Sequence, residues 1–508
     1  MKNIILTCVF IGLLAPLSAT SQTAQTPRTG HKGEWRPKER WRGFNLEGYG
    51  LKGAFAGRIE EDDMKWIHEL GFNFIRLMVD YHFIWNEADW TKPDPSKFGF
   101  IDDAIAMGKR YKLHVNLCLS IPPGIDYKVT RSKEALFADP TTQQALADYW
   151  QFMAKRYRGI PNDELTFNLF NEPNTDPKGD RYVRLIEKCV AAIRAEDPER
   201  FVVFDGLSSG FTPELGATGL YNVMQSHHMY QPMCITHYKA PWVQGQHGEP
   251  IWPPTPMVSP ICGSSKPQES RGPMVIRKVP AGIFVIDVNL VNRRGEIYVR
   301  ADGKELYRKY FLPKPDGEWT NLVARTDGEW AGKPVKKIRV EIPACDRLEV
   351  GLGEGDWVDI ARLGLKSGDK RAVIVPEYDF ARSQMPRREV WFAGFDRPQP
   401  VALDEKGTLY DGEAFLQEYV YSKWDEVLAA GQQVMVGETS FFNKTPHEIG
   451  LRWLEDNLRE WKKRNIGWAI WNFRGAFGIL DSGRSDAEYV DFHGHKLDKK
   501  MLDLLQKY

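Results

Sequence analysis

Short apolar runs alternate with longer amphipathic segments in two stretches of this chain, from Trp41 to about residue 240 and again after about residue 405. This alternation is typical of parallel β-strands joined by crossover helices. We expect eight strands, namely Arg42–Leu46, Phe72–Met78, Val115–Leu119, Leu165–Phe170, Phe201–Phe204, Val223–Ser226, Gln433–Val436 and Gly467–Ile470. Eight such strands predict an α/β fold of the (β/α)8 TIM-barrel class.

Helices are expected between these strands, and several have recognisable ends. Asp139 is placed to cap a helix with Pro140 at its first position, Gly71 to close another, and Thr445–Glu448 to form a capping box with Pro446 at the first helical position. The expected helices are Glu60–Leu70, Phe100–Tyr111, Pro140–Arg158, Tyr182–Ala195, one that ends at Ala430, one that ends at Asn465 and one that starts near Asp498.

The stretch 264–370 breaks this rhythm, because it alternates like β-strands and contains no convincing helix. Its expected strands are Phe284–Val291, Glu296–Arg300, Lys337–Ile342, Arg347–Leu352 and Asp356–Leu365, with turns at Asp302-Gly303 and Asp316-Gly317. We interpret it as a β-sandwich inserted between the sixth and seventh barrel strands, so the barrel would comprise 35–245 and 400–508. A carbohydrate-binding role and that of an independent spacer are both open.

Residues 1–21 read as an export signal, which predicts a periplasmic or secreted protein. Lys2 supplies the charge, Ile4–Leu17 the apolar stretch, and small residues follow at Ser18, Ala19 and Ser21. No later stretch approaches the roughly 20 apolar residues of a membrane-spanning helix. Five cysteines remain beyond the signal, and a bridge between Cys234 and Cys262 is one option.

The composition favours a neutral partner. With 68 basic and 68 acidic residues, the chain offers no electrostatic reason to bind nucleic acid or an anionic membrane. Its 17 Trp and 19 Tyr mildly favour a polysaccharide or oligosaccharide, whose apolar sugar faces stack on flat rings. We expect a monomer.

Two glutamates directly follow apolar strand segments. Glu172 comes just after Leu165–Phe170, and Glu438 comes just after Val434–Val436. The carboxyl ends of barrel strands carry the catalytic groups in TIM-barrel enzymes, and hydrolysis of a glycosidic bond needs two carboxyls. Either glutamate alone would more simply be a strand-end surface residue, but together they predict a glycoside hydrolase.

Six motifs in order resemble glycoside hydrolase family 5. They are Arg42-Gly43-Phe44-Asn45-Leu46, Gly71–Leu77, Asn171-Glu172-Pro173, His228-Met229-Tyr230, Gly437-Glu438 and Gly467–Asn472. The resemblance covers nearly all of the chain outside the signal and the insertion, and it implies a retaining (β/α)8 enzyme.

The resemblance also implies individual roles. Glu172 would be the acid/base and Glu438 the nucleophile, braced by Arg76; Asn171 would bind the sugar 2-hydroxyl, and Trp471 would form the floor of the −1 subsite. His228 and Tyr230 would line the site, with the Tyr230 hydroxyl beside the nucleophile. Taken singly, Arg76 could be a structural ion-pair partner and Trp471 a core residue.

One position departs from the family pattern. The third strand in many relatives ends Leu-His-x-x-Pro-Gly, whereas Leu119-Ser120-Ile121-Pro122-Pro123-Gly124 has a serine at the histidine position. His82, just after the second strand, is a candidate substitute for the missing sugar contact.

No cofactor and no catalytic metal are expected. His227 and His228 are adjacent, so on a strand they face opposite sides, and neither His-Glu-x-x-His nor Cys-x-x-Cys occurs beside them. The leading hypothesis is an exported retaining β-glycosidase acting on a β-1,4-glucan. The alternatives are a β-mannan, exo action on oligosaccharide side chains, or a non-catalytic glycan-binding barrel.

Overall fold

The computed structural model describes the chain from residue 33 onward with several gaps. The described residues are 33–47, 59–124, 135–173, 176, 180–243, 250–253, 257–378, 389–392, 394–395 and 412–508. The expected export signal, residues 1–21, lies outside these ranges. The chain divides into two compact units, one containing Ala19–Tyr230 with Tyr419–Tyr508, the other containing Gln231–Glu418.

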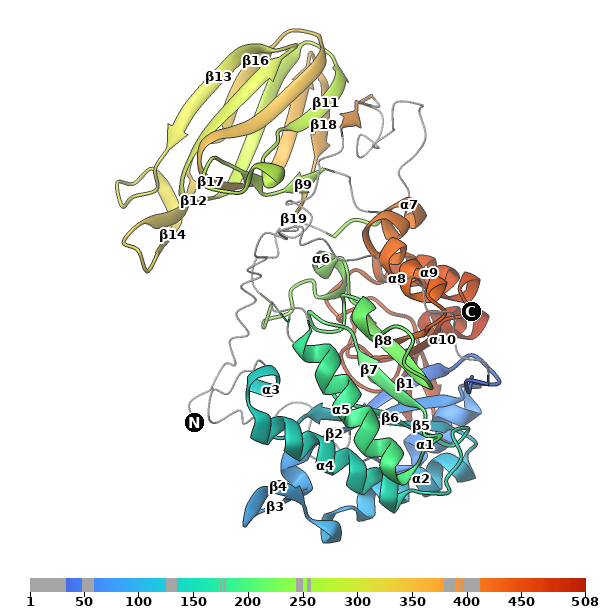
Figure 1. The fold of residues 1–508 in the computed structure, drawn as a ribbon. Helices are drawn as coiled ribbons and strands as arrows, with labels where there is room; N and C mark the ends of the chain where they lie inside the picture. Colours follow the sequence, from blue (N-terminus) through green and yellow to red (C-terminus); the bar gives the residue numbers. More distant parts are fainter. Residues whose placement is uncertain are drawn as a thin grey trace. The chain divides into compact units, whose positions relative to one another are not determined.

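The first unit is a closed barrel of eight parallel strands (Figure 1). In barrel order they are β1 (Arg42–Glu47), β2 (Phe74–Asp80), β5 (His114–Ile121), β6 (Leu165–Asn168), β7 (Val202–Asp205), β8 (Val223–Met229), β21 (Gln433–Thr439) and β22 (Gly467–Ile470). Pairing of β1 with β22 closes the barrel. The predicted TIM barrel is confirmed, and each strand end lies within three residues of its predicted position.

Helices connect these strands along the chain. The longer ones are α1 (Glu61–Glu69), α2 (Gly99–Arg110), α4 (Pro140–Arg156), α5 (Arg181–Glu196), α8 (Ser422–Ala429), α9 (His447–Lys463) and α10 (Lys499–Lys507). Short ones are η1 (Tyr81–Phe83), η2 (Pro95–Lys97), α3 (Ala135–Ala138), η3 (Leu215–Ala217), α6 (Met233–Thr236), η4 (Gln268–Ser270), α7 (Gly412–Leu416) and η6 (Gln417–Tyr421). Asp139 caps α4 as predicted, because its side chain accepts a bond from the Thr141 N–H. Gly71, with φ of +85°, follows the end of α1.

The capping box predicted at Thr445–Glu448 is wrong. Helix α9 starts at His447 with Pro446 as its N-cap, and no side chain at the cap bonds the helix. Instead the backbone N–H of His447 donates to Asp486 at 2.8 Å. A carboxylate from a distant loop satisfies the helix start, and local sequence could not reveal it.

A ten-stranded sheet lies in the second unit, between β8 and β21 in chain order. It contains β10 (Ile261–Cys262), β11 (Met274–Val279), β12 (Gly282–Ala301), β13 (Lys304–Phe311), β14 (Trp319–Ala324), β15 (Trp330–Pro334), β16 (Ile338–Ile342), β17 (Cys345–Ser367), β18 (Lys370–Ile374) and β20 (Val390–Trp391). Two-residue and hairpin strands elsewhere are β3 (Trp85–Asn86), β4 (Asp89–Pro93), β9 (Val258–Ser259), β19 (Glu377–Tyr378), β23 (Tyr489–Phe492) and β24 (His495–Asp498).

The long strands β12 and β17 correct the predicted strand boundaries. Each was expected as two strands but runs unbroken, and the register between them shifts near Asn292, Gly295 and Gly355. These bulges accommodate extra residues without ending either strand. Alternate residues of β12 are buried and contribute to an apolar core within this unit. The pairing forms one connected sheet, so the two-layer sandwich stays a prediction.

The bridge considered between Cys234 and Cys262 does not form, because both residues carry thiols. Within the described ranges, no helix combines the length and the apolar character needed to cross a membrane.

Candidate active site

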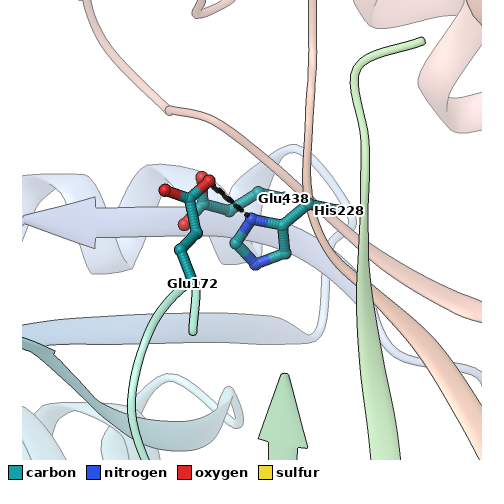
Figure 2. Close-up of side chains that lie close together, drawn as sticks. All are labelled: Glu172, His228 and Glu438. Atoms are coloured by element: carbon teal, nitrogen blue, oxygen red, sulfur yellow. Dashed lines mark hydrogen bonds and ion pairs between the residues drawn. The ribbon is translucent and has the colours of Figure 1, made fainter. Parts of the chain in front are cut away.

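The two candidate glutamates converge on one histidine. Glu438 lies in β21, Glu172 follows β6, and His228 lies in β8. His228 Nδ1 is 3.1 Å from Glu172 Oε1 and 3.7 Å from Glu438 Oε2 (Figure 2). One side-chain oxygen of each glutamate and a ring nitrogen of His228 lie within 4.8 Å of one another. The Glu438 side chain is 6% exposed and that of Glu172 is 31% exposed, so Glu172 is the more open to solvent.

Arg76 lies beside Glu438, as the resemblance implied. The guanidinium is fully buried on β2 and its Nη1 donates to Glu438 Oε1 at 2.8 Å. Its Nη2 donates to Asn171 Oδ1 at 3.0 Å and to Asp205 Oδ2 at 3.0 Å. The guanidinium of Arg76 therefore links Glu438 to Asn171, which follows β6, and to Asp205, the last residue of β7.

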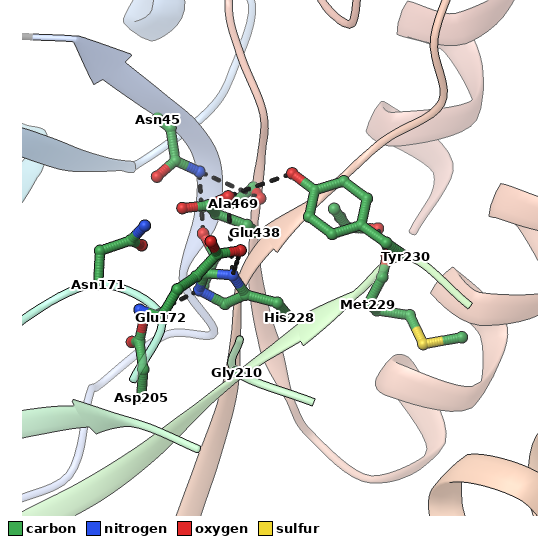
Figure 3. A network of polar contacts seen from close by, with 12 residues as sticks. Asn45, Asn171, Glu172, Asp205, Gly210, His228, Met229, Tyr230, Glu438 and Ala469 are labelled. Atoms are coloured by element: carbon green, nitrogen blue, oxygen red, sulfur yellow. Dashed lines mark hydrogen bonds and ion pairs between the residues drawn. The ribbon is translucent and has the colours of Figure 1, made fainter. Parts of the chain in front are cut away.

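The second oxygen of Glu438 meets Tyr230. The Tyr230 hydroxyl donates to Glu438 Oε2 at 3.2 Å (Figure 3). Asn45 Nδ2 donates to the Gly437 carbonyl at 2.9 Å, which ties β1 to the backbone just before Glu438. Both carboxylate oxygens thus have a donor, and the segment that carries Glu438 is itself anchored.

The charged groups in this cluster shift one another's pKa values. Burial raises the pKa of Glu438, and the charge of Glu172 adds to the rise, whereas the cations His228 and Arg76 oppose it. Burial alone would lower the pKa of His228, but the nearby carboxylates, Glu438 and Asp205 foremost, raise it to about 10. The imidazole is therefore a cation at neutral pH.

Asp205 is a member of the cluster that the sequence analysis missed. It ends β7 and is completely buried between Arg76 and His228. Burial would raise its pKa, but Arg76 and His228 outweigh that effect and hold the pKa well below its ordinary value. The signal was available, because Asp205 follows the apolar run Val202–Phe204 just as the two glutamates follow theirs.

Glu47 was also missed. It ends β1, and Asn472 Nδ2 lies 3.5 Å from its Oε1. Burial raises the pKa of Glu47 to about 8, and the charge of Glu438 contributes. A further carboxyl, largely protonated at neutral pH, therefore belongs to the same end of the barrel.

Three other positions that the sequence singled out for sugar contacts have no contact with the two glutamates among the interactions described here. His82 Nδ1 lies 2.7 Å from Asp80, and its ring packs edge-on against Trp85. Trp471 is half-buried just after β22, and its backbone N–H donates to the Thr439 carbonyl at 2.8 Å. Ser120 is 5% exposed, and its hydroxyl has no hydrogen-bond partner among the described residues. None of these contacts joins them to the two glutamates, so their roles stay predictions.

The adjacent histidines do face opposite sides of β8. The ring of His227 stacks on Trp424 with centroids 4.7 Å apart, and burial lowers its pKa to about 3. Glu172, His228 and Glu438 are spaced closely enough to hold a metal ion. However, both nitrogens of His228 face carboxylates, and a doubly protonated imidazole has no lone pair to coordinate metal. This donor set fits a proton-transfer site better than a metal site.

Comparison with known proteins agrees with the barrel and its motifs. Residues 32–255 match the family model described as cellulase (glycosyl hydrolase family 5). Endoglucanase C of Acetivibrio thermocellus is 30% identical over 194 residues, which are 38% of this chain and 56% of that protein. Cellodextrinase A of Ruminococcus flavefaciens is 23% identical over 209 residues, 40% of this chain and 61% of that protein. The chain thus spans little more than half the length of these relatives.

Solved structures support the fold. A crystal structure described as a glycoside hydrolase superposes with a TM-score of 0.56 at 23% identity, covering 92% of this chain and 99% of that one. Endoglucanase Cel5A of Thermotoga maritima gives 0.50 at 16% identity, with 92% and 96% covered. The barrel and the matched family model thus make this chain similar to cellulase-like glycoside hydrolases. More particularly, residues 32–255 are similar to glycoside hydrolase family 5, the family that the sequence motifs resemble.

Proposed function

We propose that this protein hydrolyses β-glucans with retention of configuration at the anomeric carbon. The spacing of the two carboxyls carries this proposal. Oxygens of Glu172 and Glu438 lie within 4.8 Å of each other, whereas an inverting enzyme needs about 6.5–9.5 Å to admit a water and a retaining one about 5–5.5 Å.

In the first step, Glu172 gives its proton to the glycosidic oxygen while Glu438 attacks the anomeric carbon. The bond to the leaving group breaks and an ester forms between Glu438 and the sugar. In the second step, Glu172 removes a proton from water, which attacks the same carbon and frees Glu438. Atoms and charge balance over the two steps, and no other reactant is required.

The surroundings suit these roles. Arg76 holds Glu438 Oε1 at 2.8 Å, which favours the ionised form and leaves Oε2, beside Tyr230, as the attacking oxygen. Esterification removes the charge of Glu438, so ionisation of Glu172 becomes easier in the second step. By family resemblance, Asn171 binds the 2-hydroxyl and Trp471 forms the floor beneath the sugar.

The substrate is most simply a β-1,4-glucan, because sequence relatives carry the name endoglucanase. A second candidate, action on short oligosaccharides, is favoured by the relative named cellodextrinase. Two measurements separate the glucan-cleaving activity from the oligosaccharide-cleaving one. An enzyme that cleaves within the chain lowers the viscosity of carboxymethylcellulose early, whereas an enzyme that acts at chain ends does not. The sizes of the products from cellohexaose give the second measurement.

Covalent trapping tests the mechanism. A 2-deoxy-2-fluoro-β-cellobioside with a dinitrophenolate leaving group should inactivate the protein and add one fluorosugar to the peptide that contains Glu438. Labelling of a different peptide would reassign the nucleophile. Hydrolysis that releases the α-anomer first would exclude retention altogether.

Two further proposals concern the rest of the chain. The inserted sheet is a β-sandwich that assists polymer recognition, and the first 21 residues direct export. Replacing residues 264–370 by a short Gly/Ser linker should raise KM for polymers and leave the hydrolysis of aryl glycosides nearly unaffected. Kinetic parameters that match those of the wild type on both kinds of substrate would favour the spacer role.

Sequencing the mature N-terminus of protein recovered from the periplasm or the medium tests export. A protein retained in the cytoplasm with residues 1–21 intact would contradict export.

A further inference from the structure

Asp205 contacts three parts of the candidate site at once. Its Oδ2 lies 3.0 Å from Arg76 Nη2. The same oxygen lies 3.0 Å from His228 Nε2 and 3.1 Å from the backbone nitrogen of Glu172; Asp205, His228 and Glu172 are labelled in Figure 3. Its Oδ1 accepts from Asn168 Nδ2 at 3.2 Å and lies 3.3 Å from Arg76 Nη2. The His228 contact is an ion pair rather than a well-aligned hydrogen bond. One buried carboxylate therefore holds the arginine, the histidine and the backbone of the acid/base candidate.

The contact with Asp205 affects the protonation of the His228 ring. A neutral imidazole has one N–H and one lone pair, and a lone pair pointed at a carboxylate oxygen is repelled. Here Nδ1 faces Glu172 and Glu438, while Nε2 faces Asp205. Protons on both nitrogens make the contacts with ionised Glu438 and ionised Asp205 favourable, and Asp205 is the partner on the side away from the glutamates.

Glu172 depends on Asp205 through its backbone. Its φ is +51°, in the left-handed region that strains a residue with a Cβ. The N–H of Glu172 donates to Asp205 in this conformation. Such strain persists only when the surroundings fix the residue, and Asp205 supplies one of those contacts.

We propose that Asp205 is a positioning residue that keeps His228 cationic between the two glutamates and fixes the strained backbone of Glu172. Its catalytic consequence rests on the proposed function, whereas its effect on His228 does not require turnover. With Arg76 and His228 positive and Asp205 and Glu438 negative, the four charges cancel.

This balance assigns a proton to Glu172. A second ionised glutamate would give the cluster a net negative charge, and repulsion from Glu438 and Asp205 therefore favours protonated Glu172 in the resting site. Once Glu438 is esterified the cluster has one excess positive charge, and Glu172 then favours ionisation. The groups that face Asp205 are Arg76 from β2, Asn168 from β6, His228 from β8, Glu172 and, through the Asp205 carbonyl, the Tyr182 hydroxyl of α5.

The titration of His228 tests the proposal directly. Protein labelled with 13C and 15N in histidine would be followed by NMR from pH 5 to 10, with the His228 signal assigned by its absence in His228→Asn. We expect a doubly protonated ring at pH 8.5 in the wild type and a midpoint lower by at least about one pH unit in Asp205→Asn. A neutral His228 at pH 8.5 in the wild type would overturn the proposal even if the variant failed to fold.

A matched control separates this effect from general destabilisation. Asp176 is another buried aspartate with an arginine partner, Arg181 at 2.9 Å, and it caps the start of α5 through the Tyr182 N–H. Asp176→Asn should lower the melting temperature without moving the His228 titration. An equal shift in both variants would mean that His228 responds to the loss of any buried aspartate, and the assignment to Asp205 would be wrong.

Kinetics supply the final readout. Asp205→Asn should lower kcat on an aryl β-cellobioside by about 100-fold with little change in KM, because the acid/base is displaced while substrate contacts remain. An unchanged kcat would contradict the positioning of Glu172. If the wild type hydrolyses no β-glycoside, the proposed function fails, yet the NMR titration still decides the role of Asp205.

Discussion

The two ends of this barrel bury opposite kinds of side chain. At the N-terminal end, a cluster of apolar residues fills the interior; its members are Trp41, Phe74, Phe201, Val203, Met224, Met435 and Ala469, with Trp35 packed against them. At the C-terminal end, the interior holds Arg76, Asp205, His228 and Glu438. The first set gains stability from burial, whereas the second carries desolvation costs that its ion pairs only partly offset. The difference separates the part of the fold that supports stability from the part that supports chemistry.

A buried histidine at each end makes the contrast quantitative. His114 stacks on Trp41 with ring centroids 4.3 Å apart, and burial lowers its pKa to about 4. His228 is equally buried, but nearby carboxylates raise its pKa to about 10. Burial favours the neutral ring in both cases, so the neighbouring charges decide the outcome.

The largest effect is expected for Glu438→Ala, which removes the proposed nucleophile from the charged end. Turnover on every substrate should fall by at least about 10⁴-fold, since water cannot replace a positioned nucleophile efficiently. The variant should still fold, because Arg76 keeps its contact with Asp205. Steady-state kcat/KM is the measurement, with Glu214→Gln as a control at a buried carboxylate outside the cluster. Retention of more than a few per cent of activity would mean that the wrong carboxylate has been chosen.

Glu172→Ala should have a large effect that depends on the leaving group. Glucan hydrolysis should fall by about 10²–10⁴-fold, because the glycosidic oxygen then departs without a proton. Glycosylation by a dinitrophenyl glycoside should fall much less, since that leaving group needs no protonation. Pre-steady-state measurement of the two substrates gives the comparison. Equal losses on both would remove the acid role.

The sequence predicted the barrel and the convergence of its glutamates, because both follow from local patterns at strand ends. Arg76 and Tyr230 were placed beside Glu438 by family resemblance, and their contacts at 2.8 and 3.2 Å agree with that placement. Asp205 was overlooked although it also ends a strand. Its importance comes from Arg76, which is 129 positions away in the sequence. Only closure of the barrel brings these residues together.

The same limit explains the other differences. The N–H of His447 bonds Asp486, 39 positions later, and no local capping rule includes so distant a partner. The strands β12 and β17 continue through bulges that only their mutual pairing stabilises. Local rules thus predict where elements occur, whereas contacts between elements determine their exact ends and their buried charges.

Replacing His228 at the C-terminal end of the barrel should change the pH dependence of activity, whereas replacing His114 at the N-terminal end should not. His228→Asn removes a cation that opposes the raised pKa of Glu438, so that pKa should rise further. Because the proposed mechanism needs Glu438 ionised, the acid limb of the kcat/KM profile should move to higher pH, by about one unit. His114→Asn should leave the profile unchanged. An acid limb that shifts equally in both variants would show that the effect is not electrostatic.

The smallest effect is expected in stability, where the two histidines should act on opposite sides of neutrality. His114, whose pKa falls to about 4 on folding, stabilises the protein above its unfolded pKa, and this contribution is lost as the pH falls from 6.5 through about 4. His228, whose pKa rises to about 10, contributes fully below pH 6.5, and its contribution is lost as the pH rises through about 10. Melting temperatures measured from pH 4 to 10 should therefore fall less steeply with acid in His114→Asn and less steeply with alkali in His228→Asn. Each kcal/mol corresponds to a change of about 1–2 °C for a protein of this size. Parallel curves for both variants and the wild type would mean that neither histidine changes its protonation on folding, and the electrostatic contrast between the two ends of the barrel would not hold.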